Sequence, residues 1–179
     1  MTDTLDLRPL IRTVPDFPKP GVQFRDVTTL FKDPRGFRAV VERLAQPYAG
    51  RGVDKVAGIE SRGFIVGAAV ASELRAGFVP IRKAGKLPAE NFGQDYELEY
   101  GTDRLEVHRD AFLPGERVLL VDDLIATGGT AEAALKLVRM GKGSVVGCAF
   151  VIDLPDLGGR ARLERQGYAV TALCAFGGH

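Results

Sequence analysis

Short continuous apolar runs alternate along this chain with segments whose apolar residues recur at helical spacing. The runs predicted to be strands are 55–59, 77–81, 118–121, 144–154 and 168–176. The segments predicted to be helices are 36–49, 63–74 and 130–140. This alternation predicts an α/β fold with a central parallel sheet flanked by helices.

The rest of the chain follows this pattern less clearly. The predictions there are a short helix over 5–14, a loop over 16–21, extended chain over 22–31, a long loop over 82–102 and extended chain over 105–107. The stretch 82–102 is polar and contains glycine, and a loop of that length in a compact domain is usually functional or disordered.

Composition narrows the possible functions only slightly. The 179 residues are 45% apolar and 26% charged, which suits a single soluble domain over 1–179. A net charge of +1 argues against a nucleic-acid surface, so we expect no nucleic-acid partner. We expect no membrane span and a cytoplasmic location, because the apolar runs are too short and the N-terminus is too polar for a signal peptide. Cys148 and Cys174 lie in apolar runs and are predicted to be buried thiols.

Residues 117–130, RVLLVDDLIATGGT, carry the most specific chemistry in the sequence. The apolar strand ends at Asp122 and Asp123, on the edge of a parallel sheet where ligands bind. The turn that follows opens a helix whose positive end favours an anion. That turn consists of Ala126, Thr127, Gly128, Gly129 and Thr130.

The spacing of this motif excludes two common phosphate-binding loops. No Lys follows the glycines as in a P-loop, and the dinucleotide fingerprint is absent. Carboxylates that accept hydrogen bonds from ribose hydroxyls, next to a loop that binds a monophosphate, would hold a phosphorylated ribose. The simpler alternative is a helix start with incidental acids, but a buried pair of carboxylates is costly without a partner.

A second anion site is expected at 59–64, IESRGF, between a strand and a helix. Ser61, Arg62 and Gly63 can offer a hydroxyl, a guanidinium and backbone donors to a diphosphate. A serine helix cap beside an exposed arginine is the alternative.

Three cations follow another strand end in the segment 82–88, RKAGKLP. Arg82, Lys83 and Lys86 can reach a substrate with several negative charges, although a solvated basic turn is the common alternative. Two further segments say little by themselves. YELEYG at 96–101 alternates like an edge strand, and GVQFRD at 21–26 contains a phenylalanine that could belong to the core.

Taken together, these motifs resemble the type I phosphoribosyltransferases. In that family a hydrophobic strand, two acids and a Thr-Gly-Gly-Thr turn bind 5-phosphoribosyl pyrophosphate (PRPP), as the residues around Asp122 and Asp123 would here. The elements IRK-x-GKLP, Tyr-x-Leu-Glu-Tyr-Gly and Phe-Arg-Asp are similar to those of the branch that acts on adenine. The motifs span nearly the whole chain.

The resemblance implies roles for particular residues. Residues 1–33 would contribute a small hood over the base, and 83–103 a flexible flap over PRPP. Residues 61–63 and the three cations would bind pyrophosphate, and the matching bond Glu60–Ser61 is often cis in the family. Glu99 would be the proton carrier, with Tyr100 covering the pyrophosphate side.

The resemblance also implies how the base would be held. Phe24 would stack on adenine, the backbone at Gln23 and Arg25 would read its edge, and Leu154 would close the opposite face. Mg²⁺ would be held mainly by PRPP, with no direct protein ligand.

The implied activity is purine salvage, in which adenine and PRPP give AMP and pyrophosphate, by a homodimer. Another base such as xanthine, guanine or orotate is one alternative. A PRPP-sensing regulator without turnover is another, although such proteins carry a nucleic-acid-binding surface that this composition does not indicate.

Overall fold

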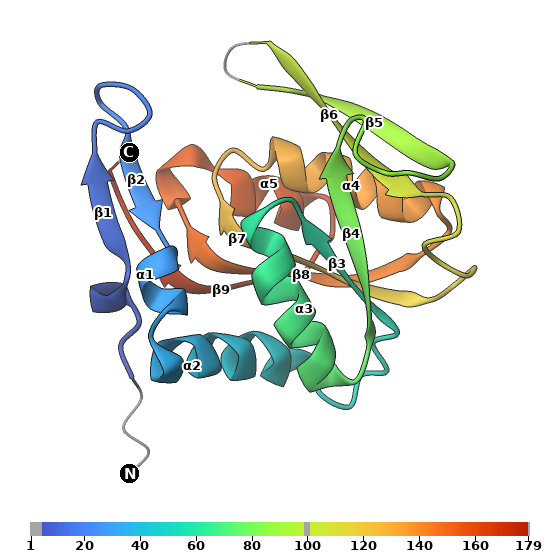
Figure 1. Cartoon of the computed structure of the whole chain (residues 1–179), viewed down its shortest axis with the longest axis horizontal. Helices are drawn as coiled ribbons and strands as arrows, with labels where there is room; N and C mark the ends of the chain where they lie inside the picture. Colours follow the sequence, from blue (N-terminus) through green and yellow to red (C-terminus); the bar gives the residue numbers. More distant parts are fainter. Residues whose placement is uncertain (1–4, 99–100, 179) are drawn as a thin grey trace.

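The computed structural model describes residues 5–98 and 101–178, which form a seven-stranded sheet covered by helices on both faces and a separate two-stranded sheet (Figure 1). The strands are β1 (Arg12–Pro15), β2 (Gln23–Asp26), β3 (Lys55–Ile59), β4 (Gly77–Lys83), β5 (Asn91–Glu97), β6 (Thr102–His108), β7 (Arg117–Ile125), β8 (Ser144–Asp153) and β9 (Val170–Ala175). The helices are α1 (Thr28–Phe31), α2 (Pro34–Ala45), α3 (Arg62–Leu74), α4 (Gly129–Met140) and α5 (Gly159–Arg165). Short 3₁₀ turns lie at Arg8–Leu10, Gln46–Tyr48 and Pro155–Leu157.

The order of strands in the large sheet changes direction at β3. The order is β5-β6-β4-β3-β7-β8-β9, and the five strands from β4 to β9 are parallel. The chain passes from β3 to β4 on one side and then to β7 on the other side of β3. In open α/β sheets, ligands bind outside the carboxyl ends of strands at such a switch point.

Two apolar layers hold the helices on the sheet. Val40, Leu44, Val66 and Val70 bring α2 and α3 to one face, with Leu119 and Val121 of β7 below them. On the other face Ala134, Leu135 and Val138 of α4 and Leu163 of α5 pack on Leu120 and Phe150. Alternate residues of β7 therefore face opposite layers, which explains the continuous apolar run at 118–121.

The predicted parallel sheet flanked by helices is confirmed, and the strand predicted at 55–59 coincides with β3. Both cysteines are free and buried, also as predicted. The sheet is mixed, however, because β6 runs antiparallel to β4 and β5 antiparallel to β6.

Three local predictions are wrong, and one helix, α5, was not predicted. The helix over 5–14 is a 3₁₀ turn followed by β1, which pairs with β2. Extended chain ends at Asp26, since α1 begins at Thr28, and α5 is absent from the sequence-based assignment. The long loop over 82–102 contains β5, whose residues pair with β6 from Asn91↔His108 to Glu97↔Thr102. β1 and β5 are each stabilised by pairing with the strand that follows, β2 and β6, so local periodicity gives little sign of either strand.

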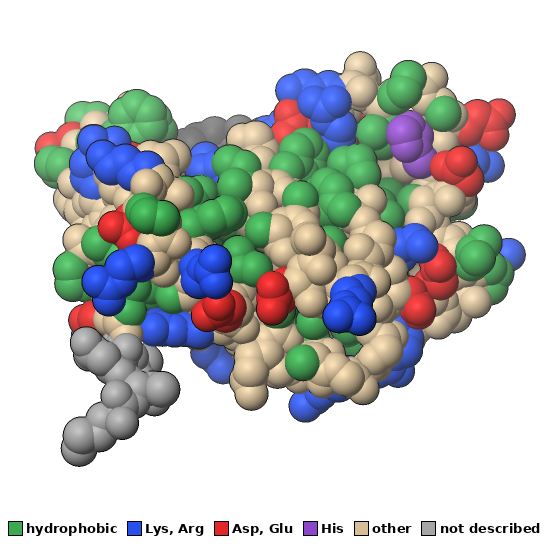
Figure 2. Space-filling model, turned by 60° about the horizontal axis from the view of Figure 1, so that its bottom comes forward, with side chains coloured by type: hydrophobic (Ala, Val, Ile, Leu, Met, Phe, Trp, Pro, Cys, Tyr) green, Lys and Arg blue, Asp and Glu red, His purple; other side chains and the backbone are tan. Residues whose placement is uncertain are grey.

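The described surface carries charges of both signs. Figure 2 shows Lys and Arg side chains interspersed with Asp and Glu on the displayed face, which agrees with a net charge of +1. Among the described helices, we find none with the length and apolar character needed to span a bilayer.

Candidate active site

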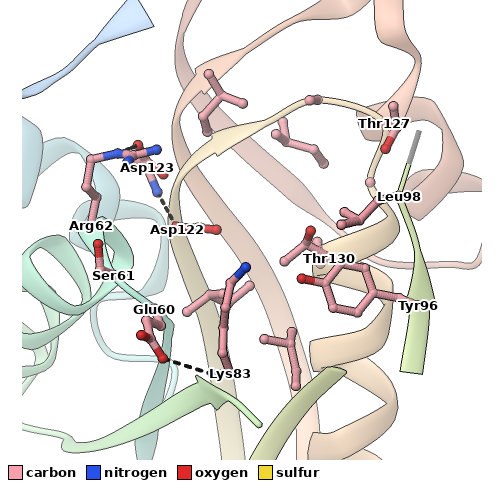
Figure 3. A pocket seen from close by; sticks show the side chains of 17 residues that line it. Glu60, Ser61, Arg62, Lys83, Tyr96, Leu98, Asp122, Asp123, Thr127 and Thr130 are labelled. Carbon is pink, nitrogen blue, oxygen red and sulfur yellow. Dashed lines mark hydrogen bonds and ion pairs between the residues drawn. The ribbon is translucent and has the colours of Figure 1, made fainter. Parts of the chain in front are cut away.

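A cavity of about 300 Å³ opens at the carboxyl ends of β3, β4 and β7, at the switch point of the sheet (Figure 3). Nine of the residues predicted for the site line it: Ser61, Arg62, Lys83, Asp122, Asp123, Ala126, Thr127, Gly128 and Thr130. They come from three segments that are far apart in sequence, 61–62, 83 and 122–130. The parallel strands bring these segments together because their carboxyl ends meet at one edge.

The phosphate loop, defined here as residues 126–130, joins β7 to α4. Gly128 has φ +85°, a left-handed conformation that a side chain would strain. Behind the loop, the Gly159 N–H donates to Ala126 O at 2.9 Å. A Cβ on Gly159 would lie 2.3 Å from that oxygen, so only glycine permits this approach. The loop is therefore held from behind while its front faces the cavity, where the N-terminus of α4 favours an anion.

Asp122 and Asp123 lie within β7, which continues two residues beyond them to Ile125. Asp123 is 5% exposed and forms an ion pair with Arg62. Asp122 Oδ1 accepts a hydrogen bond from the Asp123 N–H at 2.8 Å. Burial, followed by the charge of Asp123, raises the pKa of Asp122 well above its ordinary value. A ligand that donates hydrogen bonds to this pair would relieve that cost.

Gly63 lies behind the acids and does not line the cavity. A Cβ there would be 2.7 Å from Asp122 Oδ1, so glycine lets the start of α3 approach β7. The Glu60–Ser61 bond just before α3 is cis, as predicted from the resemblance.

Glu60 organises the predicted cations. Its carboxylate accepts from Lys86 Nζ at 2.6 Å and from the Lys83 backbone N–H at 2.9 Å, and it lies 3.4 Å from Arg82 Nε. Burial would raise the pKa of Glu60, but the hydrogen bonds from Lys86 and Lys83 hold it below its ordinary value. Of the three cations only Lys83 lines the cavity, and Arg82 and Lys86 are paired with Glu60 beside it.

The hairpin β5–β6 forms another wall. Tyr96 and Leu98 line the cavity, and Figure 3 shows Tyr96 and Lys83 reaching into it from different sides. The Tyr96 hydroxyl donates to Asp103 Oδ2 at 3.1 Å. Glu99 and Tyr100, which the resemblance implies as proton carrier and cover, lie outside the described residues.

The residues expected to bind a base do not line this cavity, although Phe24 contacts Arg62 of its wall. The Arg62 guanidinium lies 5.6 Å from the centre of the Phe24 ring, and Phe17 packs edge-on against the same ring at 5.2 Å. The side chain of Arg25 donates to the backbone oxygens of residues 177 and 178, so it ties β2 to the C-terminal segment.

The other two residues expected to bind the base, Gln23 and Leu154, lie in separate parts of the chain. Gln23 lies opposite Pro15 in the β1–β2 pair. Leu154 is 8% exposed, and its N–H donates to Ile125 O at 3.0 Å, beside the phosphate loop. Gly129, the first residue of α4, also does not line the cavity.

Several residues of the cavity wall are missing from the set chosen from sequence. They are Ile59, Glu60, Tyr96, Leu98, Leu105, Leu124, Ile125 and Ala131. For Glu60 a signal existed, because a carboxylate precedes the candidate anion site. For Tyr96, alternation within YELEYG pointed to an edge strand but not to the side it would face.

Comparison with known proteins agrees with this geometry. Residues 26–172 match the family model described as the phosphoribosyl transferase domain. The adenine phosphoribosyltransferase of Rhodopseudomonas palustris (strain HaA2) is 60% identical over 174 residues, covering 97% of this chain and 96% of that protein. That of Nitrosospira multiformis is 62% identical over 175 residues, covering 98% and 100%.

Solved structures show the same fold. The adenine phosphoribosyltransferase of Rhodothermus marinus superposes with a TM-score of 0.90 at 52% identity, covering 95% of this chain and 96% of that one. The Saccharomyces cerevisiae enzyme, solved with adenine and an imino-altritol bisphosphate, has a TM-score of 0.87 at 38% identity, with coverage of 94% and 96%. The chain therefore belongs to the phosphoribosyltransferase family, in the branch of the adenine phosphoribosyltransferases.

Proposed function

We propose that this protein transfers the 5-phosphoribosyl group from PRPP to adenine, which gives AMP and pyrophosphate with inversion at the anomeric carbon. One observation carries the proposal. A single cavity joins an acid pair, a phosphate loop at a helix N-terminus and a lysine from a neighbouring strand end. Those groups match, in order, the hydroxyls, the monophosphate and the diphosphate of PRPP. The relatives named adenine phosphoribosyltransferase support the choice of base.

The ribose phosphate is held at both ends in this proposal. The phosphate loop, residues 126–130, binds the 5-phosphate, which is remote from the reacting carbon. Asp122 and Asp123 accept hydrogen bonds from the ribose hydroxyls and offset the positive charge that develops on the ring. Binding energy gained at the phosphate is thereby used to orient the anomeric carbon.

The pyrophosphate leaves toward the cations. Ser61, Arg62 and Gly63 offer donors at the start of α3, and Lys83 extends into the cavity. Arg82 and Lys86 form ion pairs with Glu60 beside the cavity and add positive charge to the same side. Here the bond from the anomeric carbon to the pyrophosphate oxygen breaks, and no protein nucleophile is needed.

Asp122 and Asp123 are also compatible with a Mg²⁺ ion that is bound mainly through the substrate. Among residues 5–98 and 101–178, no group of three or more His, Cys, Asp or Glu side chains could hold a metal ion. Magnesium prefers oxygen ligands and often takes them from substrate phosphates. We expect PRPP to hold the ion, near Asp122 and Asp123, and the ion would neutralise charge on the leaving pyrophosphate.

The base enters from the side of β1 and β2. Phe24 stacks on adenine, the backbone at Gln23 and Arg25 reads its edge, and Leu154 closes the far face. As N9 of adenine bonds to the anomeric carbon, its proton passes to Glu99. We also propose that residues 1–33 act as the hood and 83–103 as the flap, in a cytoplasmic homodimer.

The direct test is formation of AMP from PRPP and adenine in the presence of Mg²⁺, with hypoxanthine, guanine, xanthine and orotate as competing bases. We expect turnover with adenine and at least about 100-fold lower kcat/KM with bases whose exchanged donors and acceptors leave the recognition groups unpaired. Turnover with hypoxanthine but not adenine would refute the choice of base. PRPP binding without turnover on any base would indicate a sensor.

A further inference from the structure

Lys83, the lysine that lines the cavity, is neutralised by a carboxylate that lies outside the cavity wall. Its Nζ is 2.5 Å from Asp103 Oδ2. Asp103 is the second residue of β6, and the same oxygen accepts from the Tyr96 hydroxyl at 3.1 Å. The second carboxylate oxygen accepts from the Arg104 backbone N–H at 2.8 Å. Asp103 is thus fixed in place independently of Lys83.

The backbone of Lys83 is also held without help from Asp103. Its N–H donates to Glu60 at 2.9 Å, and Lys83 pairs with Leu105 at the end of β4. Asp103 therefore contacts the ammonium group of Lys83 and does not determine the position of the Lys83 backbone. The hydrogen bond with Asp103 raises the pKa of Lys83, and the reciprocal bond lowers the pKa of Asp103, so both groups are charged at neutral pH.

This arrangement affects how an anion reaches the ammonium. A lysine ammonium has three hydrogen-bond donors and a single charge. The carboxylate takes one donor and offsets the charge, and it would repel a diphosphate that bound to the remaining donors. Lys83 is 51% exposed and Asp103 23% exposed, so water screens this repulsion only in part.

We propose that Asp103 is an internal counter-ion that competes with pyrophosphate for Lys83. It weakens the binding of PRPP and pyrophosphate and speeds the departure of pyrophosphate, because the carboxylate recaptures the ammonium as the product leaves. Asp103 is then a positioning residue that acts through Lys83. This inference rests on the proposed function, since it assumes that the diphosphate binds on the Lys83 side of the cavity.

The same hairpin offers a matched control in Asp95. It lies on β5 and pairs with Arg104 at 2.9 Å, and its side chain is 69% exposed. Asp95→Asn changes the net charge by the same amount as Asp103→Asn, in the same hairpin, without releasing Lys83.

The test measures pyrophosphate and AMP affinities by titration calorimetry for wild type, Asp103→Asn, Asp103→Glu and Asp95→Asn. We expect Asp103→Asn to bind pyrophosphate about three- to fivefold more tightly, the range typical of a partly exposed ion pair. AMP affinity should not change, and Asp95→Asn should match wild type. Asp103→Glu should also stay close to wild type. Stopped-flow measurement should show slower release of pyrophosphate from Asp103→Asn.

A second comparison ties the effect to the lysine. In a Lys83→Met background, Asp103→Asn should no longer tighten pyrophosphate binding. Asp103→Ser serves as a second neutral variant if the asparagine variant does not fold. Weaker pyrophosphate binding in the neutral variants, an equal change in Asp95→Asn or an equal change in AMP affinity would each overturn the proposal. A wild-type protein that makes no AMP and binds neither product would refute the proposed function itself.

Discussion

Replacing Gly159 with alanine should displace the phosphate loop, because the new methyl group would clash with the backbone of the loop. The new Cβ would lie 2.3 Å from Ala126 O and 2.7 Å from Gly128 N, and both are backbone atoms that cannot rotate away. Ordinary van der Waals contact begins near 3.4 Å, so the loop must move by about 1 Å. A misplacement of about 1 Å costs on the order of 100-fold in rate, and overpacking costs about 1–3 kcal/mol of folding free energy.

The assay is steady-state formation of AMP at varied PRPP, combined with urea unfolding of both proteins. We expect kcat/KM for PRPP to fall by about 100-fold while the KM for adenine changes little. Gly158→Ala is the control. A Cβ there meets nothing within 4 Å, and the cost is limited to strain at φ +74°, about 1–2 kcal/mol. A Gly159→Ala enzyme with normal kcat/KM, or a Gly158→Ala enzyme equally impaired, would refute this reasoning.

Four further substitutions test separate parts of the site. Glu99→Gln should lower kcat by about two orders of magnitude while PRPP still binds, and near-normal turnover would remove Glu99 from proton transfer. Phe24→Ala should raise the KM for adenine by about tenfold or more and leave the KM for PRPP unchanged, and an equal rise in both would argue against stacking. The pKa of Asp122 is raised above its ordinary value of 3.8, so the folded protein binds this proton more tightly than the unfolded chain does. The free energy of unfolding therefore falls as the pH rises above about 4. Asp122→Asn should therefore raise the free energy of unfolding at pH 7 but not near about pH 3, while PRPP binds more weakly; urea unfolding at both pH values checks this. The hydrogen bond from Thr28 lowers the pKa of Asp26 from 3.8 to about 2, so its stabilisation is present above about pH 4 and disappears as pH falls toward 2. Asp26→Asn should cost at most about 2 kcal/mol at pH 7 and only a small part of that near about pH 2, and a cost independent of pH would contradict this assignment.

The parts of the site that sequence predicts well are those in which chemistry and local structure coincide. The acids and the phosphate loop follow one another within 122–130, between a buried strand and a helix, so their order along the chain already describes half of the cavity. Ser61 and Arg62 are similar, because a strand end and a helix start define their position. The cis bond at Glu60–Ser61 was implied by the resemblance alone.

The flap and the hood are harder to predict because strand pairing, and not burial of one face, makes their chain extended. β5 is a polar strand at the sheet edge, and only its pairing with β6 makes it extended. β1 is likewise extended through β2, where local spacing had indicated a helix. The spacing of apolar residues reveals elements that bury one face against another layer. β1 and β5 bury few residues, so their spacing is not informative.

By itself, the sequence determines the class of fold, the two acids with their loop and the family to which the chain belongs. Each of these depends on residues adjacent along the chain, or on motifs that are specific one by one. Tertiary structure alone decides which charges meet across segments. Arg62 pairs with Asp123, Glu60 holds Lys86, and Asp103 neutralises Lys83, although in each pair more than fifteen positions separate the partners. Coulombic attraction depends on distance in space, and the order of strands in the sheet sets that distance.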